Sequence, residues 1–224
     1  MKLIFTFSLA CSILFSCKKN NDDAAPGFNI NQLEGYVISG AVIRSTGFTP
    51  FAAEFLPGQK VKLGYETFYY DSKDYVIDKD TLKVNDNIKL VIKNKKVTHY
   101  YYYSSNPYTP GSSTHDLSFN LYKKPEASQL QGKTFTGTYY NYPDGSVLHN
   151  SFYYKFAQNT NTLAAGFTIG MPVRSNPYIN IGNVAAFAQP GNDRELMVWH
   201  NGRLLAIYFN KEENQYQYAL LSPQ

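Results

Sequence analysis

Apolar and polar residues alternate over short segments through most of the chain after residue 30. A period of two predicts β-strands that bury one face, and the Gly, Pro, Asn and Asp residues between the segments predict turns. We expect strands over 33–43, 60–70, 87–93, 96–104 and 115–122, and a second series over 133–141, 147–157, 162–168, 178–188, 194–200, 203–210 and 215–221.

Three dipeptides between these segments predict hairpin turns: Asn94-Lys95, Asp144-Gly145 and Asn201-Gly202. Asn, Asp and Gly accept the positive φ that a two-residue hairpin turn needs. The last turn would place Trp199 opposite Leu204 and Val198 opposite Leu205. Apolar residues on both faces of that hairpin indicate that both faces are covered.

One segment departs from this pattern. In Thr49–Phe55, Thr49 is a suitable helix cap and Pro50 a suitable first helical residue, so we expect one or two helical turns there. Elsewhere the 20 Tyr and 15 Phe favour strands. The predicted fold class is all-β, an antiparallel meander that forms a β-sandwich or a barrel.

The chain has two similar starting points, at Leu33 and at Leu130, each followed by the spacing L-x-G-x4-G. Phe68-Tyr69-Tyr70 also resembles Phe152-Tyr153-Tyr154, although the offset between such pairs varies. Two related β-rich halves, 30–125 and 126–224, would explain the similarity. The alternative is that any tyrosine-rich meander produces such matches by chance.

The N-terminal segment has one lysine, then a short apolar run, then Leu14-Phe15-Ser16-Cys17. This arrangement resembles the lipobox signal of bacterial lipoproteins, including those of Bacteroidota. The resemblance implies cleavage between Ser16 and Cys17, removal of a 1–16 signal peptide, and lipidation of Cys17. Acyl chains on that cysteine would anchor the protein to the outer membrane, with surface display as an alternative. Residues 17–29 are polar and predict a flexible tether.

Cys11 lies in the expected leader, so Cys17 would be the single cysteine of the mature chain. Disulfides, thiol nucleophiles and cysteine metal sites are therefore not expected. The formal charge of +4 is mild and dispersed, which argues against a nucleic-acid partner. The Leu-x-Gly entry into the second series of strands is similar to lipocalin-like barrels, although Thr134 stands where those usually carry Trp.

No catalytic motif, cofactor motif or metal site is predicted. His99, His115, His149 and His200 lack metal-binding spacing. Asp71, Asp74, Asp78 and Asp80 do not follow the EF-hand pattern, so a solvated loop is favoured. Dispersed carboxylates of a glycosidase would leave no local motif, but we expect no enzyme.

Tyr100 and Tyr102 are the candidate ligand-binding residues, because they lie in the tyrosine-rich segment 97–104. Exposed tyrosine rings stack on sugars, whereas half-buried tyrosines merely fill β positions. The hypothesis is a lipid-anchored envelope protein that binds a glycan or another surface ligand. The alternative is a structural envelope lipoprotein whose partners are other envelope proteins.

Replacing Cys17 by Ala should leave the precursor uncleaved and unlabelled by radioactive fatty acid, because no thiol remains to accept the lipid. Fatty-acid labelling in cells followed by gel analysis measures this. Normal labelling of Cys17→Ala would contradict the anchor assignment.

Overall fold

The computed structural model describes residues 29–44, 47–84, 87–102 and 117–224. These residues form seventeen strands and no helix, which confirms the all-β prediction. Within the described ranges there is accordingly no helix able to cross a membrane. Ser16 and Cys17 lie outside the described residues, so lipidation stays a prediction.

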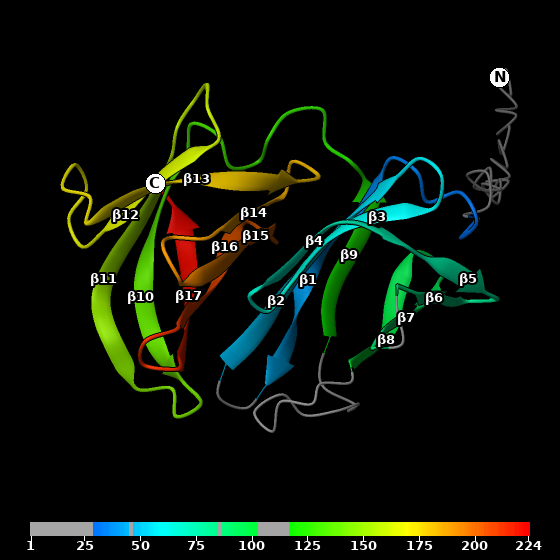
Figure 1. Cartoon of the computed structure of the whole chain (residues 1–224), viewed down its shortest axis with the longest axis horizontal. Helices are drawn as coiled ribbons and strands as arrows, with labels where there is room; N and C mark the ends of the chain where they lie inside the picture. Colours follow the sequence, from blue (N-terminus) through cyan, green and yellow to red (C-terminus); the bar gives the residue numbers. More distant parts are fainter. Residues whose placement is uncertain (1–28, 45–46, 85–86, 103–116) are drawn as a thin grey trace, which may run out of the picture.

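The first half of the chain forms two antiparallel sheets (Figure 1). The first sheet has the order β4-β3-β2-β1-β9, with β1 (Tyr36–Arg44), β2 (Gly47–Leu56), β3 (Lys60–Tyr65), β4 (Phe68–Asp74) and β9 (Leu117–Lys123). The second sheet has the order β5-β6-β7-β8, with β5 (Val76–Asp78), β6 (Thr81–Lys83), β7 (Ile88–Lys93) and β8 (Lys96–Tyr102).

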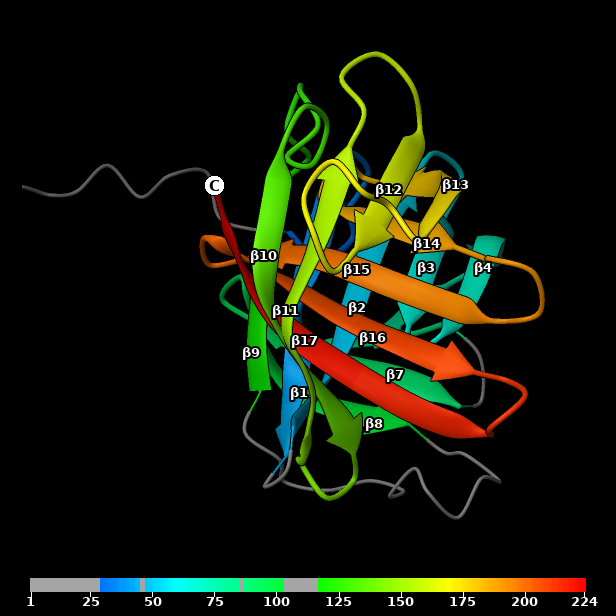
Figure 2. The same cartoon turned by 90° about the vertical axis from the view of Figure 1, so that its left-hand side faces the viewer.

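The second half forms a closed barrel in which each strand pairs with the next and the last pairs with the first. Its strands are β10 (Thr134–Tyr142), β11 (Val147–Phe156), β12 (Thr162–Gly166), β13 (Arg174–Ile181), β14 (Ala185–Ala188), β15 (Arg194–His200), β16 (Arg203–Asn210) and β17 (Gln215–Pro223). Seen from the barrel side, β15, β16 and β17 cross β10 and β11 at a steep angle (Figure 2).

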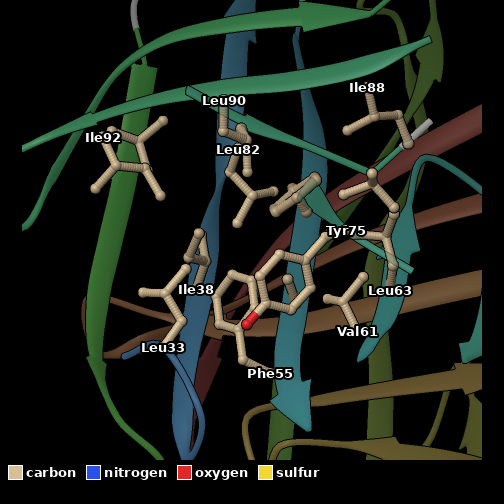
Figure 3. Close-up of a cluster of buried hydrophobic side chains, with 14 of the residues drawn as sticks. Leu33, Ile38, Phe55, Val61, Leu63, Tyr75, Leu82, Ile88, Leu90 and Ile92 are labelled. Carbon is tan, nitrogen blue, oxygen red and sulfur yellow. The ribbon is translucent and has the colours of Figure 1, made fainter. Parts of the chain in front are cut away.

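The space between the two sheets of the first half is filled by apolar side chains. Figure 3 shows ten of them converging from both sheets: Leu33, Ile38, Phe55, Val61, Leu63, Tyr75, Leu82, Ile88, Leu90 and Ile92. All ten are buried. Burying a side chain of this size stabilises a fold by about 1.5–3 kcal/mol, so this core holds the two sheets together.

The first sheet is also covered on its other face, by the wall of the barrel. Val37 and Ala52 pack there against Ile181, Leu196 and Val198. A polar link crosses the same interface: Glu54 accepts hydrogen bonds from Lys124 Nζ at 2.6 Å and from the backbone N–H of Gly182 at 2.9 Å. The first sheet therefore lies between two apolar layers.

The prediction of helical turns at Thr49–Phe55 is wrong, because these residues belong to β2. Residues 48–55 of this strand are all buried, with Phe51 and Phe55 on the side of the second sheet and Ala52 on the side of the barrel. A strand covered on both faces shows no polar–apolar alternation. Without that alternation, the preference of Thr49 for a helix cap and of Pro50 for a first helical residue led to the wrong prediction of a helix.

The three predicted hairpins are present, and Trp199 pairs with Leu204 and Val198 with Leu205 as expected. Two predicted strands are each two strands in the structure. The segment 60–70 turns at Glu66-Thr67, and 178–188 turns at Gly182-Asn183. Both Glu66 and Asn183 adopt positive φ. The barrel consequently has eight strands where the sequence predicts seven.

The two halves share one plan. In each, most consecutive strands pair with one another and the first strand pairs with the last, β1 with β9 and β10 with β17. The first half is not closed by hydrogen bonds, because β4 and β5, and likewise β8 and β9, belong to different sheets. The connection between the halves, residues 124–133, contains the domain boundary expected at 125 and 126.

The L-x-G-x4-G residues occupy corresponding places in this plan. Leu33 and Leu130 are both fully buried, and each enters the core of its own half. Gly35 and Gly132 both have φ +75°. Their N–H groups donate to the carbonyl of Phe55 at 3.1 Å and of Phe156 at 3.2 Å, near the end of the second strand of each half.

The tyrosine-rich match does not correspond in the same way. Phe68–Tyr70 begins the fourth strand of the first half, whereas Phe152–Tyr154 lies in the second strand of the barrel. The similarity of those two segments therefore reflects composition rather than equivalent positions.

Replacing Gly40 by Ala should lower the free energy of unfolding by about 3 kcal/mol or more. A Cβ there would meet the Ser118 carbonyl oxygen and lie 2.8 Å from the Phe119 Cα, both backbone atoms of the paired strand β9. Urea unfolding followed by fluorescence measures the change.

Gly191→Ala is the control, because a Cβ at that position meets nothing within 4 Å. Its positive φ should cost only about 1–2 kcal/mol. Equal losses in the two variants would contradict the close approach of β1 to β9.

Candidate functional site

A buried polar cluster lies inside the barrel. Glu195 on β15 is fully buried and pairs with Arg174 on β13, whose Nη2 lies 2.6 Å from Glu195 Oε1. The hydroxyl of Tyr154 on β11 donates to the same oxygen, and that of Tyr139 on β10 lies 3.3 Å away. The two tyrosine hydroxyls are also hydrogen-bonded to each other. Four strands thus contribute to one network.

The network is held together electrostatically. Burial, reinforced by the charge of Glu195, raises the pKa of Tyr139 and of Tyr154 well above the ordinary value. Burial lowers the pKa of Arg174, but the interactions with Glu195, Tyr154 and Tyr139 together outweigh burial, so that the pKa is raised. The tyrosines stay neutral donors and the arginine stays charged at physiological pH. Removing one member of such a buried pair leaves an uncompensated charge.

Arg174 also packs on aromatic rings. Its guanidinium carbon lies 4.8 Å from the ring centre of Tyr208 and 5.9 Å from that of Tyr154. The hydroxyl of Tyr208 in turn donates to Asp193. Nη1 and Nε of Arg174 have no hydrogen-bond partner among the described residues, so the guanidinium keeps donors for another acceptor.

A small pocket opens directly above this network, and we call it the barrel-mouth pocket. Its volume is about 170 Å³, and it is lined by Tyr139, His149, Phe152, Val173, Arg174, Tyr208 and Gln217. Three of these residues have aromatic rings besides the imidazole. The polar groups are the guanidinium of Arg174, the imidazole of His149 and the amide of Gln217. The pocket can therefore receive a ring on its walls and hydrogen-bond its polar substituents.

One rim of this pocket is an exposed apolar loop, Phe167–Val173, between β12 and β13. Phe167 contacts His149 and Phe152, with ring centres 4.6 and 5.5 Å apart. Ile169, Met171 and Val173 are exposed as well, Met171 by 72%. The loop carries no charged residue. Clustered exposed apolar side chains of this kind mark contact surfaces.

A larger open groove lies between the two halves, and we call it the inter-half groove. Its volume is about 890 Å³. It is lined by Ser39, by 94–97 at the β7–β8 turn, by 119–122 on β9, by Pro125 and Gln129, and by Trp199–Gly202 at the β15–β16 turn. His200 is buried beneath it, where its Nε2 lies 2.8 Å from Ser118 Oγ. Burial lowers the pKa of His200, so the ring is neutral at pH 7.

The predicted ligand-binding tyrosines are placed differently from the expectation. Tyr102 is only 9% exposed, and its ring packs 5.0 Å from that of Tyr65. Tyr100 is half-buried and packs against Phe51 and Phe119 at 5.6 and 5.9 Å. Both side chains face the core of the first half, so they do not form an exposed platform. A ligand-binding role for Tyr100 and Tyr102 stays a prediction.

The acidic stretch is neutralised by lysines. Asp71, Asp74, Asp78 and Asp80 pair with Lys62, Lys60, Lys83 and Lys93 respectively. Among the described residues no group of three or more His, Cys, Asp or Glu side chains is placed to hold a metal ion. His99 and His149 lie on different halves, and His115 is outside the described residues.

Sequence reasoning missed the Glu195–Arg174 network. Arg174 and Glu195 are separated by 21 positions and by one strand of the barrel, β14. One signal was present: Glu195 directly precedes the apolar run Leu196–Trp199 of β15, at a position with the same parity as Met197 and Trp199. A charged residue on the same face of a strand as apolar residues predicts either that the strand lies at the edge of a sheet or that the charge has a buried partner.

The chain matches no protein-family model, no curated protein and no solved structure. Its site is therefore interpreted from geometry and chemistry.

The free energy of unfolding should be steady from pH 7 to 9 and fall above about pH 10. Folding raises the pKa of Tyr139 and Tyr154, so the stability that comes from keeping them neutral is complete below the unfolded pKa and is lost as pH rises beyond it. Each such tyrosine contributes a slope of about 1.4 kcal/mol per pH unit. Urea unfolding between pH 8 and 11.5 measures it.

The double variant Tyr139→Phe/Tyr154→Phe should show a shallower alkaline slope, whatever its stability at pH 8. The readout is the slope of the free energy of unfolding against pH. The lost hydrogen bonds change the free energy of unfolding by the same amount at each pH and so leave this slope unchanged. Identical slopes in the variant and the parent chain would contradict the raised pKa values.

Proposed function

We propose that this chain is a lipid-anchored cell-envelope protein that binds a glycan or a similar hydroxylated surface ligand. The ligand would place one ring in the barrel-mouth pocket. The observation that carries the proposal is the composition of that pocket: aromatic walls from Tyr139, Phe152 and Tyr208 beside the hydrogen-bonding groups of Arg174 and Gln217. Sugar rings are bound by this combination of stacking and directional hydrogen bonds.

The size of the pocket supports a single ring. A cavity of about 150 Å³ holds benzene, and the barrel-mouth pocket has about 170 Å³. The rest of the ligand would extend outward past the loop Phe167–Val173, which forms the rim. Eight-stranded barrels of other proteins hold one small ligand in their interior.

The ring of the ligand that enters this pocket would be uncharged. Glu195 already compensates the charge of Arg174 at 2.6 Å, so an anion would gain little net attraction. The unused N–H groups of Arg174 suit a hydroxyl or carbonyl oxygen. Binding rather than catalysis is proposed because Asp and Glu are missing from the pocket lining, whereas glycoside cleavage needs two carboxylates flanking the bond.

A structural envelope lipoprotein is the second candidate. The exposed apolar loop Phe167–Val173 favours it, because such a surface also suits contact with another protein. In that case the barrel-mouth pocket would have no glycan ligand.

The test is a glycan array with the mature chain from Lys18, beside His149→Ala and Gln217→Ala. Neither side chain makes a hydrogen bond to another described residue, and both line the pocket. We expect each variant to weaken binding of a neutral glycan at least five-fold, because each removes one hydrogen bond to the bound ring.

Gln131→Ala is the matched control, since Gln131 is a half-buried glutamine outside the pocket, just before the start of β10, and is bonded to Asn161. It should bind like the parent chain. Parent-like binding by both pocket variants would disprove the pocket assignment. No glycan binding by the parent chain, with capture of an envelope protein that Met171→Ser abolishes, would favour the structural role.

A further inference from the structure

The inter-half groove is far larger than one ring requires. With about 890 Å³ against about 170 Å³, it has roughly five times the volume of the barrel-mouth pocket. One side is the β7–β8 turn, and the other is the β15–β16 turn with β9 between them. The groove exists because β8 and β9 belong to different sheets and leave the first half open between them. Its volume is large enough for several linked rings.

Charge in the groove has one sign. None of its lining residues is Asp or Glu, whereas Lys95 and Lys96 both line it and are exposed. Other lysines of the first half, such as Lys83 and Lys93, are paired with aspartates. Neither Lys95 nor Lys96 has an ion-pair partner among the described residues. An anion in the groove would therefore meet uncompensated positive charge.

The turn geometry fixes the backbone positions from which the side chains of Lys95 and Lys96 extend. Asn94 and Lys95 both adopt positive φ, +49° and +61°, as a tight two-residue hairpin requires. Lys95 and Lys96 are consecutive, so two cationic side chains leave the chain from one rigid turn. Repeated anionic groups on a chain ligand could engage both.

The remaining lining suits hydroxylated rings. Asn120 Nδ2 donates to Asn201 Oδ1 at 2.8 Å, and Asn201 Nδ2 lies 3.0 Å from His200 Nε2. These contacts orient both amides, and the side-chain oxygen of Asn120 has no hydrogen-bond partner within the described part of the chain. Phe119, Tyr122 and Trp199 also line the groove and are half-buried, with the rings of Phe119 and Trp199 packed on Phe51 and Phe135, so the amides lie beside the cationic rim.

We propose that the inter-half groove binds an anionic polysaccharide, a chain of hexose units that carry carboxylate or sulfate groups. Lys95 and Lys96 would pair with the acidic groups, and the asparagine amides would hydrogen-bond the hydroxyls. This site is separate from the barrel-mouth pocket and does not depend on it.

The experiment measures binding of the mature chain from Lys18 to polygalacturonate, dextran sulfate, neutral dextran and polyglutamate by biolayer interferometry. Polygalacturonate and dextran sulfate separate carboxylate from sulfate ligands. Neutral dextran removes the charge, and polyglutamate keeps the charge without the sugar. Each probe is measured at 50 and 300 mM NaCl, because salt screens exposed charges.

The parent chain should bind at least one anionic polysaccharide ten-fold more tightly than dextran or polyglutamate, and more weakly in high salt. Lys95→Gln/Lys96→Gln should weaken that binding at least ten-fold. The control Lys155→Gln/Lys211→Gln removes the same charge from exposed lysines outside the groove and should change it less than two-fold. Gln217→Ala should also leave it unchanged, which separates this site from the barrel-mouth pocket.

Three results would overturn the proposal. Equal losses in the two double-lysine variants would show only a general effect of the +4 net charge. Polyglutamate binding as tight as polysaccharide binding would identify an acidic protein as the partner instead. Anionic polysaccharide binding that survives Lys95→Gln/Lys96→Gln would place the ligand elsewhere.

Discussion

The covering of the first sheet on both faces is the constraint on which the rest of the structure depends. One face packs on the second sheet and the other on the barrel wall, so the backbones of three layers must approach closely. Small residues make this approach feasible. A Cβ on Gly64 would lie 2.7 Å from Leu196 Cδ1, and one on Gly182 would overlap Val37. The seam between the halves is therefore set by glycines as much as by apolar contacts.

Sequence periodicity predicts strands well where one face meets solvent or where the turn chemistry is strong. The hairpin at Asn201-Gly202 has the predicted register because two positive-φ residues leave little choice. The same reasoning fails at β2, where both faces are buried and the signal of alternation disappears. It also fails at Gly182-Asn183, where apolar residues continue on both sides of the turn and conceal it.

The candidate site was less predictable than the fold, because its members come from distant strands. Tyr139, Tyr154, Arg174 and Glu195 meet only once the barrel closes between β10 and β17. Each residue alone resembles an ordinary strand residue. The sequence clustering of Tyr100 and Tyr102 suggests a ligand site, but in the structure both side chains pack against the core of the first half. Proximity along the chain was a poor guide to proximity in space.

The close contact between the two halves at Gly64 and Gly182 has a mechanical consequence. Separating the halves would expose the apolar faces of the first sheet and of the barrel wall together, and would break the hydrogen bond from Gly182 to Glu54. Neither half can loosen without a large loss of buried apolar area, so the described residues behave as one cooperative unit. A pull applied at the start of β1 would then reach the barrel as a rigid load instead of being absorbed at a hinge.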